Sequence, residues 1–153
     1  DLTRILGLER AWPVILIGAG RLGQAIVTYP GFTPEGFHIQ AAFDTDDAVI
    51  GTQIADIEIR PVQEVPKYVR QKEIEIAIVA VPGEQAQSVI DGLIKVGIRA
   101  IVNYAPSNPR VPSGVRVRTI DPVQALQTMT FHLTDQRHPE QPAAPRAANA
   151  ANR

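Results

Sequence analysis

The most constraining feature of the sequence is the glycine-rich segment GAGRLG at residues 18–23, because of what stands on either side of it. It follows a continuous apolar run, residues 14–17, which is typical of a parallel strand covered on both faces. After it, apolar residues recur at helical spacing up to Thr28, before Pro30 and Gly31 end the pattern. The sequence therefore predicts strand, tight turn and helix, the opening unit of a Rossmann-type fold that holds a dinucleotide.

Each of the three glycines in such a turn has a separate physical role. Gly18 permits the tight bend, Gly20 lets the backbone approach a pyrophosphate, and Gly23 lets helix and strand pack closely. The free amides and the dipole at the helix N-terminus favour a bound anion. We therefore expect the pyrophosphate on the whole segment, which consists of Gly18, Ala19, Gly20, Arg21, Leu22 and Gly23. The alternative is that the glycines only turn the chain.

A carboxylate, Asp44, ends the next predicted strand, residues 37–44. It stands about 20 residues beyond the glycines, where dinucleotide sites place the group that binds the adenosine ribose. Asp46 and Asp47 would repel an added 2′-phosphate, so we expect NAD(H) rather than NADP(H). The alternatives are an exposed turn residue for Asp44 and solvated turn acids for the other two.

The rest of the chain alternates strands with helices, which predicts an α/β fold: a doubly wound, mostly parallel sheet with helices on both faces. Further strands are expected at residues 54–59, 74–81, 100–104 and 115–120, and helices at residues 62–72 and 86–94. Two of the later strand ends lie at the carboxyl edge of the sheet, where such folds bind ligands. We expect them to line the nicotinamide side with Val81, Pro82, Asn103, Ala105 and Pro106. For the two prolines a purely structural role as strand stops stays open.

A last helix is expected from Pro122, with Asp121 as its N-cap. Its apolar face must pack on its own sheet or on another subunit, and comprises Val123, Leu126, Met129 and Leu133.

The predicted domain organisation has three parts. Residues 1–12 have the pattern of a short amphipathic linker helix, residues 13–134 form the Rossmann domain, and the polar, alanine- and proline-containing residues 135–153 form a disordered tail. Because the sequence opens on Asp1 without a signal-peptide pattern, we expect a cut or processed start.

Composition and residue types exclude several function classes. A formal net charge of −1 gives no basic footprint for nucleic acid, and no apolar run is long enough for a membrane span. The absence of cysteine excludes disulfides and thiolate metal sites. His38, His132 and His138 are expected at the surface rather than as general bases. A strong cofactor site without catalytic equipment favours a sensor or part of a larger protein over an enzyme.

Several separated segments also occur together and in order: GAGRLG, TYPGF, AAFDTD, VAVPGEQAQ, GIRAIVNYAPSNPRVP and TIDPVQAL. With them, the chain from Ile5 to about Leu133 resembles the Rex redox-sensing transcriptional repressors, and ILGLERAW resembles that family's link between its DNA-binding and nucleotide-binding domains. The resemblance implies a cytoplasmic homodimer that compares NADH with NAD+ and performs no catalytic turnover. NADH would close the dimer and release operator DNA.

The resemblance also assigns roles that the residues alone do not. It implies that the last helix is exchanged between subunits and that Tyr29 and Asp121 form a hydrogen bond across the dimer in the NADH state. From the sequence alone Tyr29 is a helix-end aromatic residue and Asp121 an N-cap.

Three departures from the family pattern stand out. The sequence has no counterpart of the family's winged-helix domain, so we expect operator binding only through a domain outside it. Pro122 replaces a bulky apolar residue that approaches the partner's nicotinamide in relatives, and Arg21 stands where many relatives carry Asn. Two other functions stay open: the CoA- or NAD-binding part of a ligase or dehydrogenase, and a dimerisation module without redox sensing.

Overall fold

A computed structural model describes residues 11–137 of the chain. The strands are β1 (Trp12–Ile17), β2 (Phe37–Asp44), β3 (Gln53–Ile54), β4 (Ile57–Pro61), β5 (Ile76–Val79), β6 (Ala100–Asn103) and β7 (Arg116–Thr119). The helices are α2 (Arg21–Thr28), α3 (Val65–Lys72), α4 (Gly83–Lys95) and α5 (Pro122–Arg137), with 3-10 turns η1 (Thr33–Glu35) and η2 (Val62–Glu64). These elements form two units, which divide between Asp121 and Pro122.

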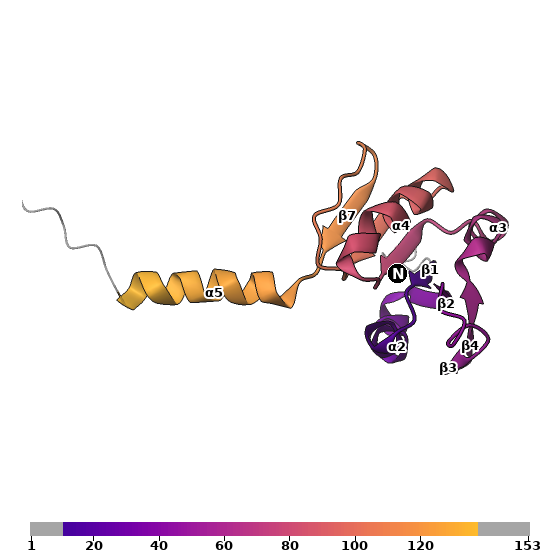
Figure 1. Ribbon diagram of the computed structural model, residues 1–153, viewed down its shortest axis with the longest axis horizontal. Coiled ribbons are helices and arrows are strands. Elements are labelled where there is room, and N and C mark those ends of the chain that lie inside the picture. Colours follow the sequence, from indigo (N-terminus) through magenta and orange to yellow (C-terminus); the bar gives the residue numbers. More distant parts are fainter. Residues whose placement is uncertain (1–10, 138–153) are drawn as a thin grey trace, which may run out of the picture. The chain divides into compact units, whose positions relative to one another are not determined.

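The first unit, described over residues 11–121 and called the body below, contains a seven-stranded sheet (Figure 1). Its strand order is β3-β4-β2-β1-β5-β6-β7, and every pair of neighbours except β3 and β4 runs parallel. The doubly wound, mostly parallel sheet predicted from the sequence is confirmed. The strand that precedes the glycine turn lies at its centre.

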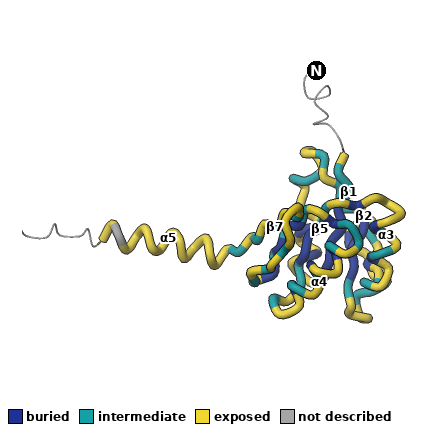
Figure 2. Tube along the Cα trace, turned by 90° about the horizontal axis from the view of Figure 1, so that it is seen from above, coloured by how far each residue is buried: buried dark blue, intermediate teal, exposed yellow. Residues whose placement is uncertain are grey.

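The strands bury apolar side chains on both faces of the sheet. Figure 2 shows buried residues, in dark blue, along the strands. On one face, residues of α3 and α4 complete a core that includes the fully buried Ile15, Phe43 and Ile90. On the other face, Ile26 of α2 packs into a second core with Leu16. Burial on both faces explains the continuous apolar run before the glycines. Each such side chain contributes about 1.5–3 kcal/mol to folding.

The single strand predicted at residues 54–59 is wrong. The segment forms a tight hairpin in which β3 and β4 run antiparallel and Ile54 pairs with Ile57. Ala55, in the turn, has a φ of 53°, a left-handed conformation that is uncommon for alanine. The alternation of apolar and polar residues breaks at Ala55 and Asp56, which leaves Ile54 and Ile57 three residues apart, and this shift by one residue is the sequence signal of the reversal.

The other predicted elements differ from the structure mainly at their ends. Helix 62–72 begins as the turn η2, and Pro66 falls in the first turn of α3, where the missing amide costs no helical hydrogen bond. Residues 1–10 of the proposed linker helix lie outside the described residues, and its last residue, Trp12, belongs to β1. Of the proposed tail, residues 135–137 belong to α5 and residues 138–153 lie outside the described residues.

The second unit is described as the helix α5, which begins at Pro122 as the sequence predicts. Hydroxyl groups of Thr128, Thr130 and Thr134 donate hydrogen bonds to backbone carbonyls in the preceding turn. Its large apolar side chains are exposed, namely Val123, Leu126, Met129, Phe131 and Leu133. Within residues 11–137, no helix is long and apolar enough to cross a membrane.

Candidate functional site

A cavity of about 270 Å³ lies at the carboxyl edge of the sheet, where β1 has β2 on one side and β5 on the other. A change of direction in strand order at such a point is the usual ligand position in open α/β sheets. The cavity is lined by five residues that the sequence analysis proposed for the cofactor: Gly18, Gly20, Asp44, Val81 and Pro82. It is completed by Ile17, Thr45, Val62, Ala80, Gln85 and Val89.

The three glycines of the turn differ in what surrounds them. Gly18 has a φ of 100°, and a Cβ there would collide with the carbonyl oxygen of Ala80 at the end of β5. A Cβ on Gly23 would collide with the carbonyl oxygen of Gly18. At Gly20, by contrast, no heavy atom lies within 4 Å of the Cβ position. Gly18 and Gly23 therefore have steric reasons to be glycine, whereas Gly20 keeps open space beside the cavity.

The N-terminus of α2 faces this turn with no side chain capping it. The first amides of any α-helix lack partners within the helix, and their partial positive charge suits a phosphate group. Arg21 stands exposed at the first helical position, and Leu22 is also exposed, so both offer backbone amides rather than packed side chains. Ala19 differs, because its amide donates a hydrogen bond to Asp44.

Asp44 joins the end of β2 to the glycine turn. Its Oδ2 atom accepts the hydrogen bond from the amide of Ala19 at 2.8 Å. Its Oδ1 atom accepts bonds from the amides of Thr45, at 2.7 Å, and Asp46, at 2.9 Å. A carboxylate oxygen can accept two hydrogen bonds, so Oδ2 keeps capacity for a hydroxyl group in the cavity. Asp44 is thus both a structural link and an acceptor that lines the cavity.

The two neighbouring carboxylates are exposed in the turn after β2. Asp46 accepts a hydrogen bond from the amide of Ala48 at 2.9 Å, a local turn contact, and Asp47 is also exposed. Both add negative charge beside Asp44 without lining the cavity.

The residues proposed at the end of β6 and in the loop after it are not among those that line this cavity. Asn103 is fully buried, and its side chain is hydrogen-bonded within the following loop. Ala105 is buried as well, whereas Pro106 is exposed. A Cβ on Gly83, at the start of α4, would lie 2.6 Å from the carbonyl oxygen of Pro106. The backbone after β6 therefore closely approaches the segment that follows Pro82.

Tyr29 lies at the C-terminal end of α2 and borders a different cavity. The residue is 58% exposed, and its ring packs edge-on against Phe32, with 5.1 Å between ring centroids. The cavity, about 360 Å³, lies on the α2 face of the sheet and is called the α2-face groove below. Its lining is almost entirely apolar and includes Val14, Ile39, Ile76, Ile78 and Val102. Asp121 and Pro122 stand at the junction of the two units, where α5 begins.

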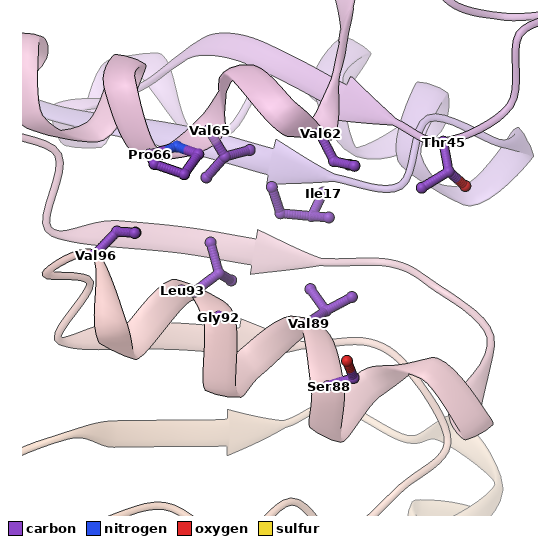
Figure 3. A pocket seen from close by; sticks show the side chains of 10 residues that line it. All are labelled: Ile17, Thr45, Val62, Val65, Pro66, Ser88, Val89, Gly92, Leu93 and Val96. Atoms are coloured by element: carbon purple, nitrogen blue, oxygen red, sulfur yellow. The ribbon is translucent and has the colours of Figure 1, made fainter.

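Sequence reasoning missed an apolar cavity of about 240 Å³ between α3 and α4. Figure 3 shows side chains from both helices pointing into it, with Thr45 and Val62 at the end nearest the carboxyl edge of the sheet. It shares four lining residues with the polar cavity: Ile17, Thr45, Val62 and Val89. A flat, uncharged ring system suits such a lining. The one sequence signal for this cavity was the position of Val62, directly after the strand β4 and therefore at the carboxyl edge of the sheet.

Ionisable groups are scarce around these two cavities. Among the residues that line them, Asp44 is the one with an ionisable side chain. In the described part of the chain no group of His, Asp and Glu residues could hold a metal ion. His38 is partly exposed in β2, His132 is exposed on α5, and His138 lies outside the described residues. The arrangement suits ligand binding better than proton transfer.

The fold and this pair of cavities define a Rossmann-type domain of the kind that holds nucleotides. Residues 9–107 match the family model of the CoA binding domain, and the chain belongs to this family. The redox-sensing transcriptional repressor Rex of Chloroflexus aurantiacus is 51% identical over 138 residues, which cover 90% of this chain and 65% of that protein. The chain thus spans just under two thirds of this relative's length.

Solved structures of RSP, a Rex-family repressor, have the same fold. Its complex with β-NAD+ and operator DNA is 35% identical with a TM-score of 0.82, over 89% of this chain and 63% of that one. Its complex with β-NADH is 35% identical with a TM-score of 0.78, over 89% and 66%. The resemblance to Rex repressors drawn from the sequence is confirmed.

Proposed function

We propose that this chain is the NAD(H)-binding, redox-sensing and dimerisation domain of a Rex-like transcriptional repressor. The observation that carries the proposal is the cavity in which Gly18, Gly20 and Asp44 meet the uncapped N-terminus of α2. It is supported by relatives named as redox-sensing repressors and by the RSP complexes with β-NAD+ and β-NADH. Among the described residues that line the cavities, none is equipped as a general acid or base beyond Asp44, whose carboxylate holds the turn. We therefore assign it no enzyme activity.

The described residues divide naturally among the parts of a dinucleotide. The open space at Gly20 and the first amides of α2 receive the pyrophosphate. Asp44 accepts hydrogen bonds from the hydroxyl groups of the adenosine ribose, and the apolar cavity between α3 and α4 receives the adenine ring. Val81 and Pro82 line the nicotinamide side, and the backbone of Ala105 and Pro106 supports it from the neighbouring strand end.

The same geometry favours NAD(H) over NADP(H). A 2′-phosphate on the ribose would stand beside the carboxylate of Asp44, with Asp46 and Asp47 close by in the sequence. Repulsion between the 2′-phosphate and these carboxylates would weaken the binding of NADP(H).

Dimerisation through α5 accounts for two apolar surfaces. The helix exposes five large apolar side chains, and the α2-face groove is a separate apolar surface on the body, bordered by Tyr29. A second copy offers both surfaces again, so a symmetric pair can cover them. Tyr29, Asp121 and Pro122 then serve as the residues through which cofactor state alters the dimer. Operator DNA is bound by a domain outside this sequence, in the cytoplasm.

Titration of the purified chain with NADH, NAD+, NADPH and CoA, with sedimentation measured in parallel, tests this function. We expect NADH to bind more tightly than NAD+, NADPH to bind more weakly than NADH, and the chain to sediment as a dimer. NADH affinity no greater than that for NAD+ removes the redox-sensing role and leaves a dimerisation module, for which Pro122 is the sequence hint.

A second candidate is CoA binding, which the name of the matching family model favours. CoA also carries an adenosine and a pyrophosphate, so the glycine turn and the apolar cavity suit it equally. Binding of CoA in the absence of NADH binding would favour the nucleotide-binding part of a ligase.

A further inference from the structure

Asn103 is the one polar residue among the fully buried side chains of the body, within the described residues. Its Oδ1 atom accepts a hydrogen bond from the amide of Ala105 at 3.0 Å. Its Nδ2 atom lies 3.2 Å from each of three acceptors: the carbonyl oxygen of Ala105, Oγ of Ser107 and Oγ1 of Thr119. A buried amide with every group bonded is strongly fixed in position.

These partners belong to two different parts of the chain. Ala105 and Ser107 begin the loop between β6 and β7, residues 104–115, which passes close to Gly83 through Pro106. Thr119 ends β7, two residues before Asp121. The backbone strengthens the same junction, because the amide of Ile120 donates to the carbonyl oxygen of Asn103 at 2.8 Å. Asn103 therefore joins the strand end beside the cofactor cavity to the segment that leads into α5.

The β6–β7 loop has a second fixed point, which is independent of Asn103. The side chain of Gln87 on α4 accepts a hydrogen bond from the amide of Arg110 at 2.8 Å and donates one to its carbonyl oxygen at 2.9 Å. Gln87 holds the middle of the loop against α4, whereas Asn103 holds its start against β7. The two residues give the same loop two attachments with different consequences.

We propose that Asn103 is a positioning residue that couples the nicotinamide side of the cavity to the root of α5. The inference rests on the proposed function, and it assigns Asn103 an indirect role, because its own side chain does not line the cavity. A ligand that shifts the backbone of Ala105 and Pro106 shifts Asn103 as well, and Thr119 and Asp121 follow. Asparagine suits this place because it offers an acceptor and donors on one short side chain, which neither aspartate nor leucine does.

The inference is tested by comparing NADH with ADP-ribose, which lacks the nicotinamide, and by measuring dimer dissociation with and without NADH. Asn103→Ala removes the link, and Thr119→Val removes only the side-chain bond of Asn103 to β7, with little change of volume and with the backbone pairing kept. Gln87→Ala is the matched control, because it releases the same loop at its other attachment. All variants are made in the full chain.

For Asn103→Ala we expect NADH affinity to fall about fivefold, the effect of one net hydrogen bond, with ADP-ribose affinity changed by less than about twofold. For Thr119→Val we expect both affinities within about twofold of the wild type, while the effect of NADH on dimer dissociation shrinks about fivefold. Gln87→Ala should leave unchanged both the ratio of NADH affinity to ADP-ribose affinity and the effect of NADH on dimer dissociation.

Equal losses of NADH and ADP-ribose affinity in Asn103→Ala would show a merely structural role and overturn the inference. An undiminished effect of NADH on dimerisation in Thr119→Val overturns it too, and this result decides the matter if Asn103→Ala does not fold. A wild-type chain that binds no NADH, or that dimerises without regard to it, contradicts the proposed function and the coupling together. If the wild-type chain behaves as expected and only the variants do not, the coupling alone is wrong and the proposed function stands.

Discussion

The body buries its large apolar side chains, whereas α5 exposes them. Phe43 in β2 is completely buried between helix and sheet residues, whereas Phe131 on α5 is 66% exposed. Buried apolar area stabilises the body within a single chain, while α5 gains little from its apolar residues until something covers them. One sequence thus combines a body that buries its own apolar residues with a helix whose apolar surface is suited to association.

The same substitution in both regions tests this contrast most directly. Phe43→Ala should lower the free energy of unfolding by about 3–5 kcal/mol, because it leaves a cavity in the core. Phe131→Ala should change the unfolding of the body by less than about 0.5 kcal/mol in dilute solution, because it removes no buried contact there. Urea denaturation followed by circular dichroism measures both. Similar losses for the two variants would contradict the division into a stable body and an exposed helix.

Within the body, two glycines of one turn separate folding from binding. Gly23→Ala places a Cβ against the carbonyl oxygen of Gly18, so we expect about 1–3 kcal/mol of destabilisation. Gly20→Ala meets no atom within 4 Å, so stability should hold while NADH affinity falls about tenfold or more, since the methyl group fills the space for the pyrophosphate. Thermal melting and calorimetric titration give the two values. Unchanged NADH affinity in Gly20→Ala would place the pyrophosphate elsewhere.

Asp44 should affect both properties at once, because it bonds the glycine turn and faces the cavity. Asp44→Ala leaves the amide of Ala19 without its acceptor, and we expect a loss of stability of about 1–2 kcal/mol with weaker NADH binding. The preference for NADH over NADPH should also decrease. Asp56→Asn is the control, since it removes an exposed charge in the turn between β3 and β4, away from the cavity. Fluorescence titration with NADH and NADPH measures this preference. An unaltered preference in Asp44→Ala would show that Asp44 does not contact the ribose.

On the other side of the comparison, Leu126 represents the exposed surface of α5. Leu126→Ser should weaken dimerisation about tenfold, as expected for the loss of a buried leucine at an interface, and leave the unfolding of the body unchanged. Gln127→Ser on the same helix is the matched control. Analytical ultracentrifugation over a range of concentrations measures the change. Equal dimerisation in the two variants would assign the interface to another surface.

The smallest expected effect concerns a single titration in the body. Burial raises the pKa of Tyr68, and the charge of Arg60, 5.3 Å from the ring, opposes this rise. Because the folded-state pKa is raised, the stability contributed by neutral Tyr68 is complete below its unfolded pKa of about 10 and is lost as the pH rises through the folded value. Arg60→Gln should raise this pKa further, as followed by ultraviolet absorbance, and Arg118→Gln should not. A lowered pKa in Arg60→Gln would contradict the assignment.

The sequence predicted the parts of the fold whose signals are local. The strand Phe37–Asp44 has the predicted bounds, because an apolar run and a turn residue mark its ends. The hairpin around Ala55 was missed because its turn occupies only two residues, Ala55 and Asp56, and shifts the alternation of side chains by a single residue. The position of the glycine turn was predictable in the same way, since strand, glycines and helix follow one another without a gap.

The site could be predicted only where it depends on one stretch of chain. Gly20 and Asp44, which line the polar cavity, stand in local motifs, but the apolar cavity is lined by Val62 of η2 and Val89 of α4, which only the fold brings to the same face of the sheet. The burial of Asn103 was equally hidden, because its partner Thr119 is brought beside it by the pairing of β6 with β7. Spacing along a sequence does not encode such long-range meetings.

The exposed apolar residues of α5 also bear on how long the protein survives. If a second copy covers them, a newly synthesised chain presents an uncovered apolar helix until it meets its partner, and such segments are the ones that chaperones and proteases engage. Scarce copies would then be cleared faster than abundant ones. The level of the protein would therefore rise more steeply than its rate of synthesis.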